Sequence, residues 1–294
     1  MSTLSIKVGD RIIDLSSPVV MGILNVTPDS FSDGGLLRSA VAGEVFHVSV
    51  DKALRRAQSM VEAGASIIDV GGESTRPGAR RISEQEELDR VLPVVEALRK
   101  NLDVAVSVDT SQPGVIRAAL VAGAGLINDV RALQQVGAME AVAADSAVSV
   151  CLMHMRGQPE TMQREVVYED VLTEVFAFLE ERIRACEQSG IDKSRIIVDP
   201  GFGFGKTPRH NYQLLGRLDS FTKLGVPLLI GVSRKSMLGA ATGRDVDARL
   251  AAAIAATMYG LLHGARIIRT HDVAETMDAI SIQRAISGAL LIQD

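Results

Sequence analysis

The chain has 294 residues, of which 47% are hydrophobic and 23% charged, and its net charge is -5. This length suits one large domain with a substantial core. The acidic balance excludes a general nucleic-acid-binding protein, because phosphate binding needs a dense basic surface. No apolar stretch approaches the roughly 20 residues that a membrane helix requires. The first ten residues, MSTLSIKVGD, also lack the pattern of a signal peptide. We therefore expect a cytoplasmic protein that does not bind membranes.

Aromatic residues make up only 3% of the chain and Trp is absent. The core must therefore consist of Val, Ile, Leu and Ala, which is typical of a parallel sheet covered by helices. The two cysteines, Cys151 and Cys186, belong to no recognisable motif. We expect two buried thiols in a reducing compartment.

The first expected element is a small hairpin over residues 5–15, with its turn at Gly9 and Asp10. We assign residues 1–17 to this hairpin and residues 18–294 to the domain whose floor it closes. No linker or low-complexity stretch interrupts this longer segment, so we expect a single domain.

Eight short β-rich apolar runs follow, and helical stretches separate them. The runs cover residues 19–24, 66–70, 104–108, 125–129, 148–153, 195–199, 227–231 and 265–269. Ser83 and Glu86 predict a capping box for a helix that continues through Lys100. Pro113 suits a first helical turn, and glycines 64, 123 and 190 are expected to end helices.

Eight strand–helix repeats in this length predict an α/β fold, a (β/α)8 TIM barrel. An open, doubly wound sheet is the alternative fold. The first strand is not followed by a Gly-rich dinucleotide fingerprint, which favours the barrel.

Polar residues stand where the predicted strands end, and a barrel of this kind places its chemistry at that end. The residues are Asn25, Gly71 to Pro77, Asp109, Asn128, Asp129, His154, Asp199, Ser233 to Lys235, Arg269 and His271. Any one of them is equally well explained as a helix cap or a turn residue. Eight such coincidences indicate a shared site.

The types of these residues indicate the chemistry of a ligand. Asp109, Asp199, Asn128 and Lys235 suit a flat heterocycle with several N–H and C=O groups. Arg269 and His271, expected to face Asn25 across the mouth, suit an anionic leaving group. The sequence shows no nucleophile with an adjacent base and no cluster that would hold a metal alone. A Mg²⁺ ion held partly by substrate phosphates remains compatible with this pattern.

Two polar, glycine-containing loops, residues 26–35 and 71–78, are expected to close over the barrel mouth, with ordinary surface loops as the alternative. The segment 201–206, GFGFGK, lacks the spacing of a phosphate-binding P-loop. We expect it to allow close backbone approach, with Phe204 offering a ring face to a flat ligand. Met153 and Met155 are more typical of core than of ligand contacts, although Met153 ends a strand.

Eight segments together identify a family. MGILNVTPDSFSDGG (residues 21–35) and IIDVGGESTRPGA (residues 67–79) resemble the two signature segments of dihydropteroate synthases. The other motifs follow in that family's order: VSVDT, INDVRAL, CLMHMRGQPETMQ, DPGFGFGK, GVSRKSMLG and IIRTHDV. The resemblance extends from about residue 18 to the end of the chain. One departure is the stretch 36–50, which looks longer than in close bacterial relatives.

The resemblance implies that 6-hydroxymethyl-7,8-dihydropterin diphosphate and 4-aminobenzoate combine to give 7,8-dihydropteroate and diphosphate, with Mg²⁺ as cofactor. It also implies sulfonamides as competitive inhibitors and a homodimer. The implied pterin-binding residues are Asp109, Asn128, Met153, Asp199, Phe204, Gly231 and Lys235. The implied 4-aminobenzoate-binding residues are Phe31, Thr75, Arg76, Pro77 and Ser233, with Phe204 bordering this side too. Asn25, Arg269 and His271 are implied for the diphosphate, Asn25 for the metal, and Asn25, Lys235, Arg269 and His271 for catalysis.

The polar set agrees with this chemistry. A CH2 group on an electron-rich dihydropterin can lose diphosphate early, in an SN1-like step, so the protein needs no nucleophile. Two other functions remain open. One is a methyltetrahydrofolate-binding barrel of a corrinoid methyltransferase system, which would share the pterin pocket but lack a second aromatic substrate. The other is a degenerate relative that binds pterin without turnover.

Overall fold

A computed structural model describes residues 4–27, 48–74, 81–157, 162 and 166–291 of the chain. Its larger sheet has eight parallel strands in the order β8-β7-β6-β5-β4-β3-β10-β9. A bridge between Val198 and Leu228 joins the two ends of this order, so the sheet closes into a barrel. The predicted barrel is confirmed and the open sheet is excluded. The strands are β3 (Val19–Asn25), β4 (Ile67–Gly71), β5 (Ala105–Asp109), β6 (Leu126–Asp129), β7 (Ser149–Met153), β8 (Ile196–Asp199), β9 (Leu229–Ile230) and β10 (Ile267–Thr270).

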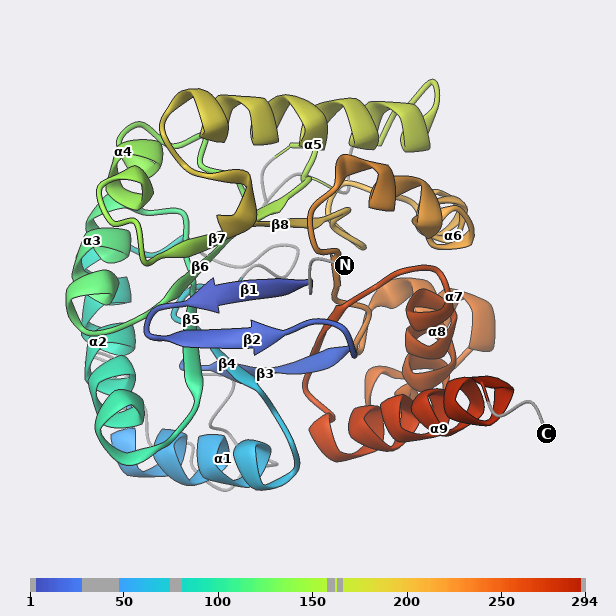
Figure 1. The fold of residues 1–294 in the computed structure, drawn as a ribbon, viewed down its shortest axis with the longest axis horizontal. Coiled ribbons are helices and arrows are strands. Elements are labelled where there is room, and N and C mark those ends of the chain that lie inside the picture. Colours follow the sequence, from blue (N-terminus) through green and yellow to red (C-terminus); the bar gives the residue numbers. More distant parts are fainter. Residues whose placement is uncertain (1–3, 28–47, 75–80, 158–161, 163–165, 292–294) are drawn as a thin grey trace.

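Helices form a ring around the strands (Figure 1). They are α1 (Val50–Glu62), α2 (Glu84–Asn101), α3 (Pro113–Val121), α4 (Ala138–Ala143), α5 (Val171–Gln188), α6 (Pro208–Gly216), α7 (Ser236–Thr242), α8 (Leu250–Leu262) and α9 (Val273–Leu291), with the 3-10 helices η2 (Lys193–Arg195), η3 (Leu218–Leu224) and η4 (Val246–Ala248). Ser83 and Glu86 form the expected capping box of α2, and Pro113 is the first residue of α3. Among the described residues, no helix is both long and apolar enough to cross a membrane.

The N-terminal hairpin lies across the bottom of the barrel (Figure 1), as expected. Its strands, β1 (Ser5–Val8) and β2 (Arg11–Asp14), are antiparallel. Their buried side chains share an apolar cluster with inward-facing residues of the barrel strands. A Cβ built on Gly125 would lie 2.2 Å from the backbone nitrogen of Gly9, so only a glycine permits this contact. The division into residues 1–17 and 18–294 stays a prediction.

The main core lies between the barrel and its helices and consists mostly of Val, Ile, Leu and Ala. Cys151 and Cys186 are both free and buried, as predicted. Burial raises the pKa of both thiols, which makes thiolate chemistry unfavourable at neutral pH.

The strand register brings the polar strand ends to one level. Asn25 pairs with Gly71, Gly71 with Asp109, and Asp109 with Asn128. Further round the barrel, Met153 pairs with Asp199. Because all eight strands are parallel, these residues surround the same mouth.

Candidate active site

The barrel mouth contains a cavity of about 590 Å³. Eleven of the residues assigned from the sequence line this one cavity: Asn25, Asp109, Asn128, Met153, Asp199, Phe204, Gly231, Ser233, Lys235, Arg269 and His271. The remaining four, Phe31, Thr75, Arg76 and Pro77, lie outside the described residues. Thr27, Glu73 and Ser74, which belong to the described parts of the two polar loops, line the cavity as well. The structure thus places the assigned residues together, while their individual roles stay predictions.

Arg269 is held between two carboxylates at the mouth. Its Nε donates to Oδ2 of Asp69 at 2.7 Å, and its Nη2 donates to Oδ2 of Asp109 at 2.6 Å. Burial by itself lowers the pKa of Arg269, but the two carboxylates outweigh it and raise the pKa above its ordinary value. Burial raises the pKa of Asp109, an effect that Asp69 adds to and Arg269 opposes. The short contact to Arg269 favours the ionised form of Asp109 against the effect of burial.

Asp69, which contacts Arg269 and Asn128 of the site, is one residue that the sequence analysis missed. It lies in the middle of β4, not at its end, and it is fully buried. Its carboxylate also accepts from Oγ of Ser107 at 2.6 Å and from Nδ2 of Asn128 at 3.0 Å. The sequence did contain a signal for Asp69, which is a charged residue inside the apolar run SIIDV. Because an unpaired buried charge is strongly destabilising, such a residue predicts a buried polar or charged partner.

The side of the cavity that the sequence assigns to the pterin combines an acid, an ammonium group and an aromatic ring. Asp199 uses Oδ1 to accept from the backbone N–H of Gly201 at 2.7 Å. Burial raises the pKa of Asp199, and it lowers the pKa of Lys235 to about 8 although Asp199 opposes that shift. The Nζ atom of Lys235 lies 4.1 Å from the ring centroid of Phe204. Lys235 therefore covers one face of the Phe204 ring. The sequence predicts that a face of this ring contacts a flat ligand.

Another part of the cavity lining is rich in basic side chains and is ordered by a small polar network. Oγ of Ser233 lies 3.0 Å from Nδ1 of His271 and donates to Asp272 at 3.3 Å. Asp272 also accepts from Arg234 at 3.0 Å. Arg249 lines the cavity too and donates to the carbonyl of Arg234 at 3.0 Å. Arg249 was not anticipated, because it precedes α8 and no predicted strand ends there.

Two strand-end residues do not belong to the cavity. Asp129 is fully buried and accepts from Ser111 and from the backbone N–H groups of Arg131 and Leu133, so it shapes its own loop. Burial raises the pKa of this carboxyl. His154 points into the protein, where burial and then nearby Lys206 lower its pKa to about 2. Asp129 is therefore the turn residue that the alternative explanation expected, whereas His154 is neither a helix cap nor a turn residue and contacts Lys206 instead.

Comparisons with known proteins agree with this geometry. Residues 21–271 match the family described as pterin binding enzyme. The dihydropteroate synthase of Escherichia coli (strain K12) is 51% identical over 277 residues, which are 94% of each chain. The Yersinia pestis dihydropteroate synthase in a sulfonamide drug complex is 49% identical, with a TM-score of 0.89 over 97% of this chain and 99% of that one.

A third relative, the Xanthomonas albilineans dihydropteroate synthase, has been solved with 4-aminobenzoic acid and, separately, with 7,8-dihydropteroate. The structure with 4-aminobenzoic acid is 46% identical, with a TM-score of 0.88 over 97% and 99% of the two chains. The complex with 7,8-dihydropteroate is 45% identical, with a TM-score of 0.83 over 95% and 97%.

The chain belongs to the dihydropteroate synthase family. Membership makes this chain a transferase and excludes the corrinoid-linked methyl-transfer alternative.

Proposed function

We propose that this chain condenses 6-hydroxymethyl-7,8-dihydropterin diphosphate with 4-aminobenzoate, giving 7,8-dihydropteroate and diphosphate for tetrahydrofolate biosynthesis. The observation that carries this proposal is the polarity of the cavity. Asp109 and Asp199 make its pterin side acidic, while Arg269, His271 and Arg249 supply cationic or hydrogen-bonding groups. The family relatives with 4-aminobenzoic acid or 7,8-dihydropteroate bound support the same substrates.

The acidic side binds the pterin ring in this proposal. Asp109, Asn128 and Asp199 provide acceptors for ring N–H groups, and Asn128 and Lys235 provide donors for ring acceptors. Met153 and Gly231 complete the wall, since both line the cavity. The two carboxylates also stabilise the positive charge that develops on the pterin when its CH2–O bond breaks.

The cationic rim binds the diphosphate as it departs. Arg269 keeps its charge because two carboxylates hold its guanidinium, and His271 is oriented by Ser233. Each well-placed donor of this kind typically contributes about 3–4 kcal/mol to the stabilisation of developing charge. The amine of 4-aminobenzoate then attacks the cationic CH2 group, so no protein nucleophile is needed.

Mg²⁺ is proposed as the cofactor, with Asn25 as its protein ligand. In the described part of the chain, no cluster of three or more His, Cys, Asp or Glu side chains could hold a metal. The donor set still fits Mg²⁺, which favours hard oxygens, keeps few protein ligands and relies on substrate phosphates. Oδ1 of Asn25 lies 3.0 Å from the point where a Cβ on Gly71 would stand, so the glycine leaves room beside this oxygen. When bound, the ion would neutralise charge on the diphosphate.

The 4-aminobenzoate side is proposed to lie near Ser233, with Phe31, Thr75, Arg76 and Pro77 supplied by the two loops. Closure of these loops would exclude the water that otherwise captures the cation. Sulfonamides, as 4-aminobenzoate mimics, are proposed competitive inhibitors, and the Yersinia pestis relative has been solved with one bound.

The proposed function is tested with purified protein, Mg²⁺ and both substrates. Diphosphate release should require both substrates, or be much faster with both, and a sulfonamide should inhibit competitively with 4-aminobenzoate. Asp199→Asn should weaken binding of the pterin diphosphate, while Arg76→Ala should chiefly raise the KM for 4-aminobenzoate. The absence of 7,8-dihydropteroate under conditions where a related synthase is active would rule out the proposed function.

We also propose a cytoplasmic homodimer. The two free, buried cysteines support the reducing compartment. Large apolar side chains remain exposed on adjacent helices α8 and α9, where Leu262 is 67% and Ile282 59% exposed. Such a face suits self-association. Light scattering should give twice the chain mass, and Leu262→Glu should lower it to that of the monomer if this face is the interface.

A further inference from the structure

Lys206 is a buried lysine for which the proposed reaction has no use. Its side chain is 2% exposed, and in the part of the chain that the structure describes it makes no ion pair. Its Nζ atom instead contacts four neutral acceptors. These are Nδ1 of His154 at 2.9 Å and the carbonyl oxygens of His154, Gly201 and Phe204 at 3.2, 2.8 and 3.1 Å.

These four contacts connect two different loops. His154 directly follows β7, whereas Gly201 and Phe204 belong to the loop that follows β8. The backbones touch, because a Cβ on Gly201 would lie 1.9 Å from the carbonyl oxygen of His154, and one on Gly205 would lie 2.3 Å from that of Arg156. The ammonium group of Lys206 contacts the carbonyl groups at the place where these two loops touch. Without it, the buried carbonyl oxygens of His154 and Phe204 would lose a donor, at a cost of about 1–3 kcal/mol each, whereas that of Gly201 would keep the backbone N–H of Phe204.

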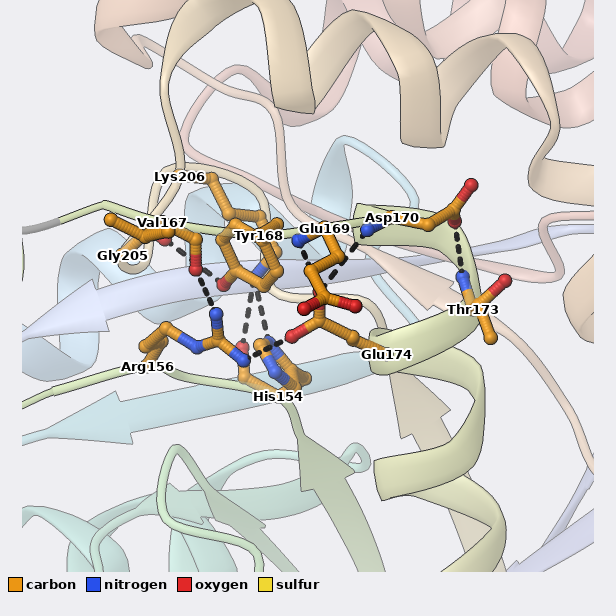
Figure 2. A network of polar contacts seen from close by, with 10 residues as sticks. All are labelled: His154, Arg156, Val167, Tyr168, Glu169, Asp170, Thr173, Glu174, Gly205 and Lys206. Carbon is orange, nitrogen blue, oxygen red and sulfur yellow. Dashed lines mark hydrogen bonds and ion pairs between the residues drawn. The ribbon is translucent and has the colours of Figure 1, made fainter.

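Further polar contacts around Tyr168 and Arg156 involve the same loops (Figure 2). The hydroxyl of Tyr168 donates to the carbonyl of Gly205 at 3.0 Å. The guanidinium of Arg156 lies 3.9 Å from the Tyr168 ring centroid and pairs with Glu174 at the start of α5. The loop after β8 is therefore held by Tyr168 as well as by Lys206.

On the inner side, the same loop forms part of the cavity wall. The backbone N–H of Gly201 donates to Asp199, and that of Phe204 donates to the carbonyl of Gly201 at 3.2 Å. Phe204 in turn lies under Lys235. A short chain of contacts thus leads from Lys206 to three residues that line the cavity, Asp199, Phe204 and Lys235.

We propose that Lys206, with His154 as its acceptor, is a positioning residue that sets the pterin-binding wall formed by Asp199, Phe204 and Lys235. This proposal rests on the proposed function only for the identity of the ligand. The lysine of a phosphate loop would direct its ammonium to the ligand. Lys206 directs its own to carbonyls of the protein, so it acts through the wall and not by contact with substrate.

Three substitutions test the role of Lys206. Lys206→Met keeps most of the side-chain length but removes the donors. His154→Gln keeps an oxygen acceptor in reach of Nζ, while His154→Leu removes it. Lys223→Met, at an exposed lysine in η3, is the matched control. For each folded variant, we would measure the KM for pterin diphosphate and hydrogen exchange of a peptide covering residues 199–207.

Lys206→Met and His154→Leu should raise the KM for pterin diphosphate about tenfold or more, because misplacement of a binding wall by about 1 Å can cost that much. Exchange in residues 199–207 should accelerate, and His154→Gln should stay within about threefold of wild type. A stabilising role without positioning would lower the melting temperature but leave the KM of the folded protein unchanged. That result, or equal defects in the two His154 variants, would overturn the proposal.

The two readouts separate this proposal from the proposed function. If the wild type lacks synthase activity, the proposed function fails, and the exchange data still decide whether Lys206 orders the wall. If the wild type is active and Lys206→Met binds pterin diphosphate normally, only the role of Lys206 is disproved. Should Lys206→Met fail to fold, the paired His154 variants carry the test.

Discussion

The Nε atom of Arg269 lies 2.7 Å from Oδ2 of Asp69, which is fully buried beneath the cavity. Asp69 on β4 accepts from Nε of Arg269 and Asp109 on β5 accepts from its Nη2, so two separate strands fix the orientation of the guanidinium. Such an arrangement presents the charge to the cavity without requiring the arginine to reorganise when substrate binds. Asp69 is not among the described residues that line the cavity. It nevertheless helps to determine the geometry of the site, because it orients Arg269.

Asp69→Asn should therefore impair activity more than folding. The amide can retain an oxygen for Arg269 and Asn128, but the negative charge that holds the guanidinium is lost. We expect kcat/KM for pterin diphosphate to fall roughly 10–100-fold, in line with the cost of small misplacements of binding groups. Ser107→Ala, which removes one neutral hydrogen bond to Asp69, is the control and should cost only about 1 kcal/mol of stability. Steady-state kinetics and urea unfolding give both values, and an Asp69→Asn enzyme within twofold of wild type would contradict the role assigned here.

The sequence anticipated the fold closely because each element carried a local signal. The apolar runs gave the strands, and Ser83, Pro113 and the glycines marked helix ends. The run at 227–231 was overestimated, since only Leu229 and Ile230 form strand β9. This run lies next to the point where the barrel closes, where a strand can make few hydrogen bonds to its neighbours. The composition of a buried run does not reveal how many of its residues make such bonds.

Site residues could be predicted from the sequence only where a polar or charged residue stands at the end of a predicted strand. Asn25, Asp109 and Asp199 were found this way, whereas Asp69 was missed because it lies inside a strand. His154 shows the opposite limit, since it ends a strand and yet turns inward to Lys206. The direction in which a strand-end side chain points depends on the residues of distant loops that it contacts. The local sequence does not predict those contacts.

Lys235 should give the reaction an alkaline limit. Burial lowers its pKa to about 8, so in the free protein its positive charge is present below that pH and is lost above it. The pH profile of kcat/KM reports groups of the free enzyme. We therefore expect kcat/KM for pterin diphosphate to decline above about pH 8. Lys235→Arg should be less active but should move this decline to higher pH, because a guanidinium stays protonated. An unchanged alkaline limb in that variant would assign the titration to another group.

Glu87 should make folding less favourable at alkaline pH. This carboxyl of α2 is 2% exposed, and its Oε1 has no hydrogen-bond partner among the described residues. Burial raises its pKa from 4.5 to about 7, with Glu73 and Asp109 adding to the effect and Thr110 opposing it. Since the folded state holds the proton more tightly, the stability that the neutral form contributes is complete below pH 4.5 and is lost as the pH rises through about 7.

Glu87→Gln keeps the shape and removes the titration. Its free energy of unfolding should exceed that of wild type by roughly 3 kcal/mol at pH 8, since each pKa unit corresponds to about 1.4 kcal/mol. The difference should shrink towards zero near pH 4.5. Asp89→Asn, at an exposed carboxyl of the same helix, should change stability by less than about 0.5 kcal/mol. Urea denaturation at several pH values measures this, and a difference between Glu87→Gln and wild type that does not vary with pH would show that Glu87 stays ionised.

Gly201 should tolerate alanine far less well than Gly190, although both have a positive φ, +70° and +86°. At Gly190 a new Cβ meets nothing within 4 Å, so Gly190→Ala should cost only the backbone strain, about 1–2 kcal/mol. At Gly201 the Cβ would lie 1.9 Å from the carbonyl oxygen of His154, and this oxygen is backbone and also bonded to Lys206. Gly201→Ala must therefore separate the loops after β7 and β8, and we expect a loss of at least about 4 kcal/mol. Urea unfolding of both variants isolates the effect of the close approach, because the strain is common to them. Equal losses would mean that the loops can part cheaply, and a wall that parts cheaply could not hold Asp199 and Phe204 in place for a ligand.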